Sequence, residues 1–155
     1  MNQPLLGLVD KKIRQLQRYN LITSQMIYED IDGVGDLIDK RQKLITALDG
    51  VSVEIKKYVS DQSIEQQDTI KRLMKFEDIE GLSEEMLQLQ NKINETKRLT
   101  DEINKNDKKA YGRIKAMRDG LLDEMSNSQK SKKIIDYFSS TNVDVNKGSR
   151  LNISK

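Results

Sequence analysis

Residues 83–122 read SEEMLQLQNKINETKRLTDEINKNDKKAYGRIKAMRDGLL, and apolar or small residues recur in them at alternating steps of three and four. The members of this stripe are Met86, Leu89, Ile93, Thr96, Thr100, Ile103, Ala110, Ile114, Met117 and Leu121. That spacing places them on one face of a helix and matches the seam of a coiled coil, with Asp107 as a polar interruption. No proline lies between Ser83 and Phe138, so we expect one long helix over residues 83–138.

The length of this helix bears on what covers its stripe. At about 1.5 Å per residue it would span about 70–80 Å, which exceeds the width of a domain of this size. We therefore expect part of the stripe to meet a partner helix, a second copy or solvent.

The composition favours an elongated bundle over a thick core. Charged residues make up 34% of the 155 residues and hydrophobic residues 35%, with two Phe and no Trp. Average globular domains contain about 45–50% apolar residues with Gly counted, so narrow helical stripes fit better than a multilayered interior. We predict an all-α fold, an elongated antiparallel helical bundle or coiled coil with one long C-terminal helix and a disordered tail.

The residue types also exclude several classes of function. The chain has no Cys and no His, which removes disulfides, thiolate chemistry, imidazole bases and the usual zinc sites. A net charge of +2 with both signs interspersed is a poor match to a dedicated nucleic-acid binder. We find no signal-peptide pattern and no apolar run long enough to span a membrane. We expect a cytoplasmic protein that is not an enzyme, uses no cofactor or metal, and does not insert into membranes.

The bundle domain is expected to cover residues 1–138, with a flexible basic tail over 139–155. Its predicted helices are 4–31, 36–60, 67–77 and 83–138. From Lys130 to the end of the chain there are six Lys or Arg against two Asp. Both an acidic partner and plain solvation are consistent with that charge.

Glycines decide where the first helices are expected to end. Two glycines in the segment Asp32-Gly33-Val34-Gly35 would cost about 1 kcal/mol each inside a helix, so a turn is predicted there and Asp36 is the predicted N-cap. A kinked continuous helix is the alternative. The pattern leaves open whether Asp49-Gly50 ends a helix. Ser83 is the predicted N-cap of the long helix.

The stripe beyond Ala110 has two interpretations. It is either plain core or a self-associating coiled coil, or it is a surface that accepts a helix from another protein. Met86, Met117 and Met125 supply adaptable apolar surface, which is common at promiscuous binding faces and also in ordinary cores.

Two segments resemble flagellar export chaperones of the FlgN type. Residues 5–26 read LLGLVDKKIRQLQRYNLITSQM, and residues 37–49, after an acidic turn, read LIDKRQKLITALD. Tyr137 and the ending GSRLNISK at residues 148–155 are similar to the family's terminal tyrosine region and its Arg-aromatic-Ile-Asp-Lys ending. Leu151 and Asn152 depart from that ending, where the family has an aromatic and an acidic residue.

The resemblance implies a cytosolic type III export chaperone. Such proteins bind the C-terminal helical region of the hook–filament junction proteins, prevent premature assembly and deliver them to the export gate. We expect the substrate protein to be contacted by Ile114, Met117, Leu121, Leu122 and Met125. By resemblance, Tyr137 is the expected export-gate contact, and packing beside Phe138 is its other interpretation.

Two alternative functions are consistent with the same pattern. One is a chaperone of the filament cap, of the FliT type. The other is a structural coiled-coil protein that associates tightly with itself, whereas an export chaperone is compatible with at most a weak homodimer.

Overall fold

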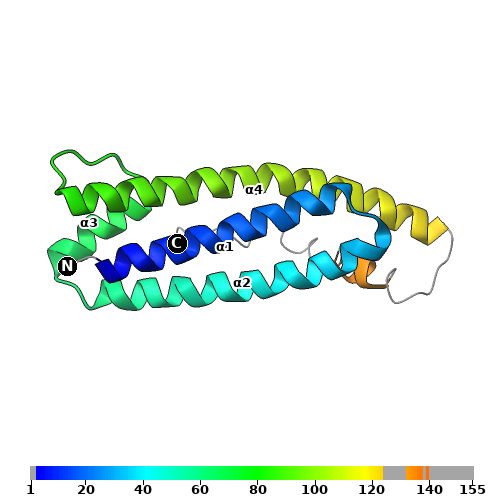
Figure 1. Cartoon of the computed structure of the whole chain (residues 1–155), viewed down its shortest axis with the longest axis horizontal. Helices are drawn as coiled ribbons and strands as arrows, with labels where there is room; N and C mark the ends of the chain where they lie inside the picture. The colour runs from blue at the N-terminus through cyan, green and yellow to red at the C-terminus, as the bar shows by residue number, and fades with distance from the viewer. Residues whose placement is uncertain (1–2, 124–131, 138, 140–155) are drawn as a thin grey trace.

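The computed structural model describes residues 3–123, 132–137 and 139, and over these residues the chain is an all-α helical bundle, which confirms the predicted fold class. The principal helices are α1 (Gln3–Tyr28), α2 (Ile31–Ser60), α3 (Ile64–Met74) and α4 (Glu84–Asp123). A further helical segment covers residues 132–137. Figure 1 shows α1, α2 and α4 extending side by side along the long axis of the molecule.

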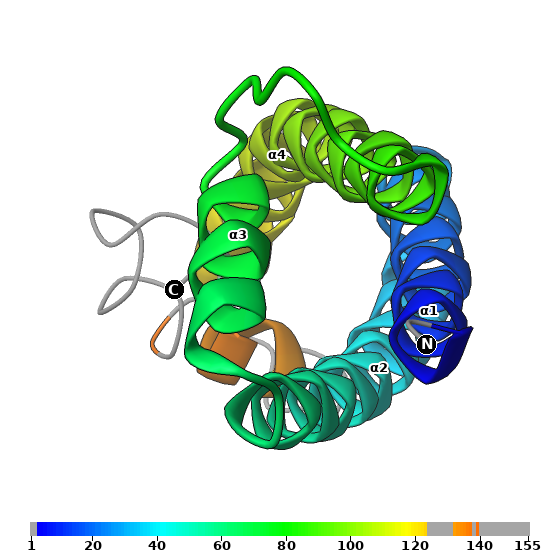
Figure 2. The same ribbon diagram turned by 90° about the vertical axis from the view of Figure 1, so that its left-hand side faces the viewer.

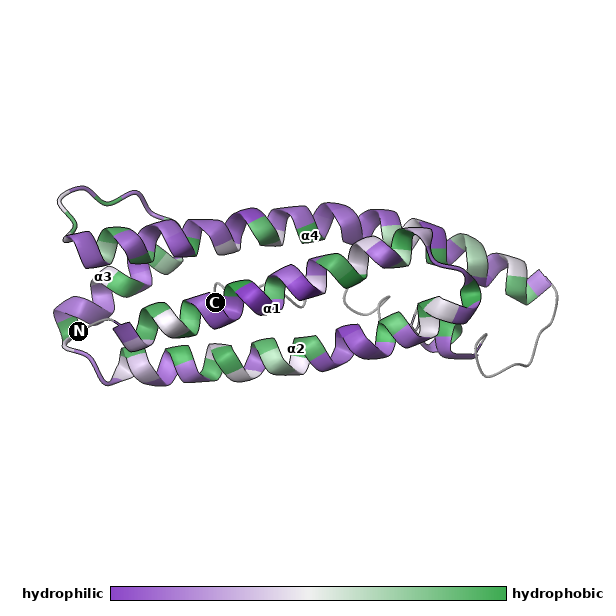
Figure 3. Cartoon of the chain, viewed as in Figure 1, coloured by the Kyte–Doolittle hydropathy of each residue, from purple (hydrophilic) through white to green (hydrophobic). Residues whose placement is uncertain are grey.

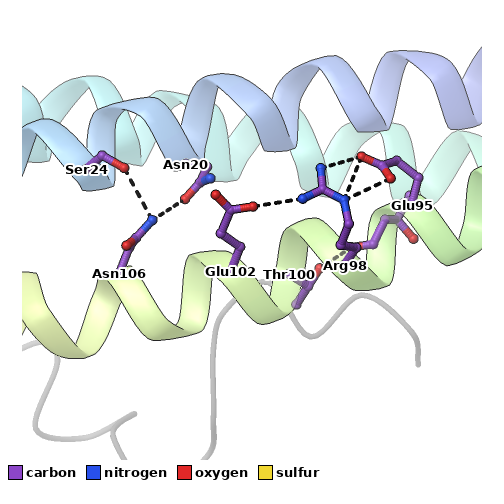
Figure 4. A network of polar contacts seen from close by, with 8 residues as sticks. Asn20, Ser24, Glu95, Arg98, Thr100, Glu102 and Asn106 are labelled. Atoms are coloured by element: carbon purple, nitrogen blue, oxygen red, sulfur yellow. Dashed lines mark hydrogen bonds and ion pairs between the residues drawn. The ribbon is translucent and has the colours of Figure 1, made fainter.

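Helix α1 is the central element of this bundle, because it packs along both α2 and α4. It runs parallel to α4, as shown by bonds from Lys92 to Asp10 and from Asn106 to Asn20. The amide of Asn106 donates to Asn20 Oδ1 at 2.8 Å and to Ser24 Oγ at 3.3 Å (Figure 4). Helix α3 contacts both α2 and α4, and Figure 2 shows it on the side of the bundle opposite α1 at one end.

Helix α2 begins earlier than predicted, so the turn expected at residues 32–35 and the N-cap expected at Asp36 are both wrong. The N-cap is Asp30, whose Oδ1 accepts the N–H of Gly33 at 2.9 Å. Gly33 therefore lies in the first turn, where its N–H is bonded by the cap and not by a helical carbonyl. Val34 is fully buried in the helical arrangement, which compensates for the two neighbouring glycines.

The other helix ends correct or confirm the remaining boundaries. Helix α1 ends at Tyr28, and α2 continues through Asp49-Gly50 to Ser60. The short helix predicted at 67–77 is found at Ile64–Met74, where Ser63 Oγ accepts the N–H of Gln66. Ser83 is confirmed as the cap of α4, because its hydroxyl accepts the N–H of Met86 at 3.2 Å.

The long helix does not run to residue 138 as predicted. Helix α4 ends at Asp123 within the described residues, and both Asp107 of α4 and Tyr137 contact the side chain of Arg41. A straight helix would separate residues 107 and 137 by about 45 Å. Segment 132–137 therefore lies back beside α2 instead of continuing α4. Residues 124–131 and 138, and the tail predicted at 139–155 apart from Ser139, lie outside the described residues.

Three apolar clusters follow one another along the bundle. The first is built from α1, α2, α3 and α4 and contains Leu5, Leu6, Val9, Val51, Ile55, Val59, Ile70, Leu73, Leu89 and Ile93. The second is built from α1, α2 and α4 and contains Leu16, Tyr19, Ile45, Leu48, Leu99 and Ile103. The third adds segment 132–137 to those three helices and contains Met26, Val34, Leu37, Ala110, Ile114 and Ile134.

Replacing Gly50 with alanine should stabilise the protein. Gly50 lies inside α2, and a Cβ added there meets no atom within 4 Å. Removing the glycine should raise the free energy of unfolding by about 0.5–1 kcal/mol, measured by urea denaturation. Gly35→Ala is the control, since its Cβ would lie 3.0 Å from Lys133 Cδ. An equal gain in both variants would contradict this account.

Lys12, a partly buried lysine of α1, should make the free energy of unfolding depend on pH. Burial lowers the pKa of Lys12 to about 8, against about 10.4 in an unfolded chain. Between these values the unfolded chain binds a proton that the native protein lacks, so the free energy of unfolding rises with pH, by at most about 1.4 kcal/mol per pH unit.

Lys12→Met removes this titration and the cost of burying the charge. The variant should be more stable than the parent at about pH 7, and its advantage should shrink between about pH 8 and pH 10. Urea unfolding of both proteins across that range measures the difference. A constant difference at all pH values would show that burial of Lys12 is not its source.

Candidate protein-binding surface at the distal end of α4

The candidate site lies on the distal end of α4, which we define as Ala110 to Asp123. Figure 1 shows this end of the helix extending past the turn that joins α1 to α2. Figure 3 shows hydrophilic residues over much of the visible surface of α4, with hydrophobic positions between them. The distal end is therefore the part of the long helix that the other principal helices cover least.

The residues expected to contact a substrate protein are not equally accessible. Ile114 is 0% exposed and belongs to the third cluster, so it is closed to a partner in this arrangement. Met117 and Leu121 are partly buried against the same cluster. Leu122 is 49% exposed. Met125 lies outside the described residues. The described distal surface therefore offers Leu122 and the accessible parts of Met117 and Leu121.

Segment 132–137 covers the inner part of the stripe. Ile134 is fully buried in the third cluster together with Ile114 and Ala110 of α4. Lys133 Nζ donates to Asp39 Oδ2 of α2 at 2.5 Å, and the stem of the same side chain passes over Gly35. The missing side chain of Gly35 thus leaves room for the segment to approach α2 closely.

The segment is also tied to the bundle by a polar group that we call the Arg41 cluster, formed by Arg41, Tyr19, Asp107 and Tyr137. Arg41 Nη1 pairs with Asp107 Oδ1 at 2.5 Å, and Nη2 donates to the Tyr137 hydroxyl at 2.8 Å. The guanidinium carbon also lies 5.2 Å from the ring centre of Tyr19 and 5.5 Å from that of Tyr137. Residues from α1, α2, α4 and segment 132–137 therefore meet at one side chain.

The electrostatics of the cluster keep Arg41 charged. Its side chain is only 9% exposed, while that of Asp107 is 27% exposed. Burial by itself would lower the pKa of Arg41, but Tyr19, Tyr137 and Asp107 together raise the pKa above its ordinary value. A buried guanidinium is stable only with such partners, because an unpaired charge is costly away from water.

The structure gives Tyr137 an intramolecular role. Its hydroxyl accepts a hydrogen bond from Arg41 and its ring faces the same guanidinium, and the residue is partly buried. These contacts hold the aromatic ring against the bundle. The expected contact with an export gate stays a prediction, and the other interpretation, packing beside Phe138, concerns a residue outside the described ones.

Sequence reasoning placed Arg41 and Asp107 on helices without connecting them. Each is a polar residue at a position that an apolar stripe would fill, Arg41 between Leu37 and Ile45 of α2 and Asp107 between Ile103 and Ala110 of α4. Opposite charges at such positions on two predicted helices are the signal that would have indicated a buried pair.

Other kinds of site find no support in the described part of the chain. It contains no group of three or more carboxylates that could hold a metal ion. None of its helices combines the length and apolar character needed to cross a membrane. Comparison with protein families, curated proteins and solved structures finds no match.

Replacing Arg41 with methionine should release segment 132–137. The variant loses the bonds to Asp107 and Tyr137, and breaking a buried pair costs about 3–5 kcal/mol, with the lower figure expected because Asp107 reaches solvent. Hydrogen exchange measured by mass spectrometry should speed up in residues 132–137 much more than in the middle of α1.

Arg98→Met is the matched control. Arg98 pairs with Glu95 and Glu102 on the exposed side of α4 (Figure 4), and exposed ion pairs contribute little to stability. Exchange in residues 132–137 should be unchanged in this variant. Similar exchange in the two variants would mean that the Arg41 cluster does not hold the segment.

Proposed function

We propose that this protein is a cytoplasmic export chaperone of the FlgN type. In this role it binds the C-terminal helical region of hook–filament junction proteins, prevents their premature assembly and delivers them to the export gate. The observation that carries the proposal is the distal end of α4, which extends past the α1–α2 turn (Figure 1). It carries the last stripe residues, Met117 and Leu121, and the exposed Leu122 beside them. The resemblance of residues 5–26 and 37–49 to that family supports it. The role requires no catalysis, cofactor or metal.

The proposed binding step is burial of an amphipathic client helix against the distal end of α4. Leu122 and the accessible parts of Met117 and Leu121 form the surface on which the client first lies. Burying a leucine or methionine side chain fully contributes about 1.5–3 kcal/mol, and ordering of the client opposes part of that gain. A few such contacts suit a chaperone that must also release its client.

Deeper contact would require segment 132–137 to move. Ile114 is buried in the same cluster as Ile134. A client helix could therefore contact Ile114 only after segment 132–137 has moved away from α4. The same movement would free Tyr137 from Arg41. In this proposal the client and the export gate act on neighbouring parts of the same end of the bundle.

Substitutions at the distal end test the proposal. The purified C-terminal region of a junction protein should bind the full-length chain, and Leu122→Asp should weaken that binding by about tenfold or more, measured by calorimetry. Leu21→Asp is the control, because Leu21 is an exposed leucine of α1, 60% exposed. Met117→Asp combined with Leu121→Asp should weaken binding further, with circular dichroism verifying the fold.

Two outcomes would contradict the proposal. Binding that is unchanged in the Leu122 and Met117/Leu121 variants would remove the distal end as the client surface. Binding of the filament-cap protein in place of junction proteins would favour the FliT-type alternative. Sedimentation at several concentrations separates the two chaperone hypotheses from the structural coiled-coil alternative. That alternative requires a tight dimer that a client does not dissociate.

A further inference from the structure

A second feature of α4 is a row of exposed residues at the spacing of a coiled-coil seam. We call it the basic seam, and it consists of Lys105, Lys108, Gly112, Lys115, Asp119 and Leu122. The steps alternate three and four, and each of these residues is exposed. Such a row lies on one face of a helix and extends for about 25 Å. It is distinct from the buried stripe that contains Ala110 and Ile114.

The seam lies in the most strongly charged part of α4. Residues 105–118 contain six Lys or Arg and one acidic residue, Asp107, which is already paired with Arg41. Lys105, Lys108 and Lys115 form no ion pair with another residue in the described part of the chain. Asp119 is paired with Arg118, so the three lysines dominate the charge of the seam.

The first half of α4 is arranged differently. There Arg98 pairs with Glu95 on one side and Glu102 on the other (Figure 4). Opposite charges at these spacings stabilise a helix, whereas the like charges of Lys105 and Lys109, four residues apart, destabilise it. Lys105 is a member of the seam, so an acidic partner beside it would offset part of that repulsion.

Gly112 lies at the middle of the seam, inside a helix that glycine weakens. A Cβ at this position would meet no atom within 4 Å, so no packing contact of the described structure requires a glycine there. A residue without a side chain lets a second helix approach the backbone closely. Leu122 adds an exposed apolar contact at the end of the row.

We propose that the basic seam binds an acidic amphipathic helix of a partner protein. The spacing suits a helix, the lysines select carboxylates, and Gly112 allows close approach of the two backbones. A second copy using the same seam is disfavoured, because it would place lysines against lysines. Nucleic acid is a poorer match, since Gly112 and Leu122 offer no charge to phosphate. Leu122 also belongs to the surface proposed for the export client, but the lysines and Gly112 do not, so the inference rests on them and not on the proposed export function.

The test uses the full-length protein and a synthetic helical peptide of about 20 residues, which matches the length of the seam. Glutamates on the peptide lie on one face at steps of three and four, beside leucines. A control peptide has the same composition with the glutamates spread around the helix. Fluorescence anisotropy should show binding of the patterned peptide that is about tenfold or more tighter and that weakens with salt.

Paired variants locate the binding face. Lys105→Glu with Lys108→Glu should weaken binding by about tenfold or more. Lys40→Glu with Lys43→Glu is the matched control, because both lysines are exposed on α2 with the same spacing and the same change in charge. It should leave binding nearly unchanged. Gly112→Leu should also weaken binding, whereas Gly50→Leu, at a glycine of α2 that is equally open, should not.

The proposal is overturned by equal binding of the two peptides, or by equal loss in the two lysine pairs, because either result shows attraction by net charge alone. It is also overturned if duplex DNA or anionic lipid vesicles bind at the seam more tightly than the patterned peptide. Circular dichroism of each variant verifies that the helices are intact. Weaker peptide binding by Gly112→Leu without loss of helix supports the seam independently of charge.

Discussion

The charge of Arg41 is the constraint on which the distal end of the molecule depends. Its guanidinium is almost completely buried, so it has to find partners, and these come from three other parts of the chain. Asp107 fixes α4 against α2, Tyr19 supplies the face of α1, and Tyr137 brings segment 132–137 onto the bundle. One polar cluster within an apolar interior thus determines how four segments are arranged, because other arrangements would leave the charge unpaired.

The apolar stripe of α4 is longer than the surface that α1 and α2 alone cover, and the chain covers its two ends in different ways. At the beginning of α4, helix α3 contributes Ile70 and Leu73 to a cluster built from four helices. At the distal end, a much shorter segment contributes Ile134. A short segment buries less apolar area than a helix of three turns, so its cover is the weaker one. The stripe is therefore covered least firmly at the distal end of α4.

Helix α4 also changes in electrostatic character along its length. Its first half pairs charges within the helix and with α1, through Arg98 and through the bond from Lys92 to Asp10. Its second half presents lysines to solvent beside Leu122. Burial of apolar area favours association but does not specify the partner. Complementary charge selects the partner and its register. Helix α4 thus carries an exposed apolar residue and a row of exposed lysines side by side.

The sequence by itself determined the all-α class, the long helix from Ser83 and the apolar face of each helix, because periodicity and capping are local properties of the chain. It misjudged Gly33 and Gly35, since a glycine in a first turn costs less than one in a helix interior and Gly35 makes room for Lys133. Only the tertiary structure brought Arg41, Asp107 and Tyr137 together and returned residues 132–137 to α2. These contacts join residues far apart in the chain, and their partners depend on which helix faces pack, which no local pattern specifies.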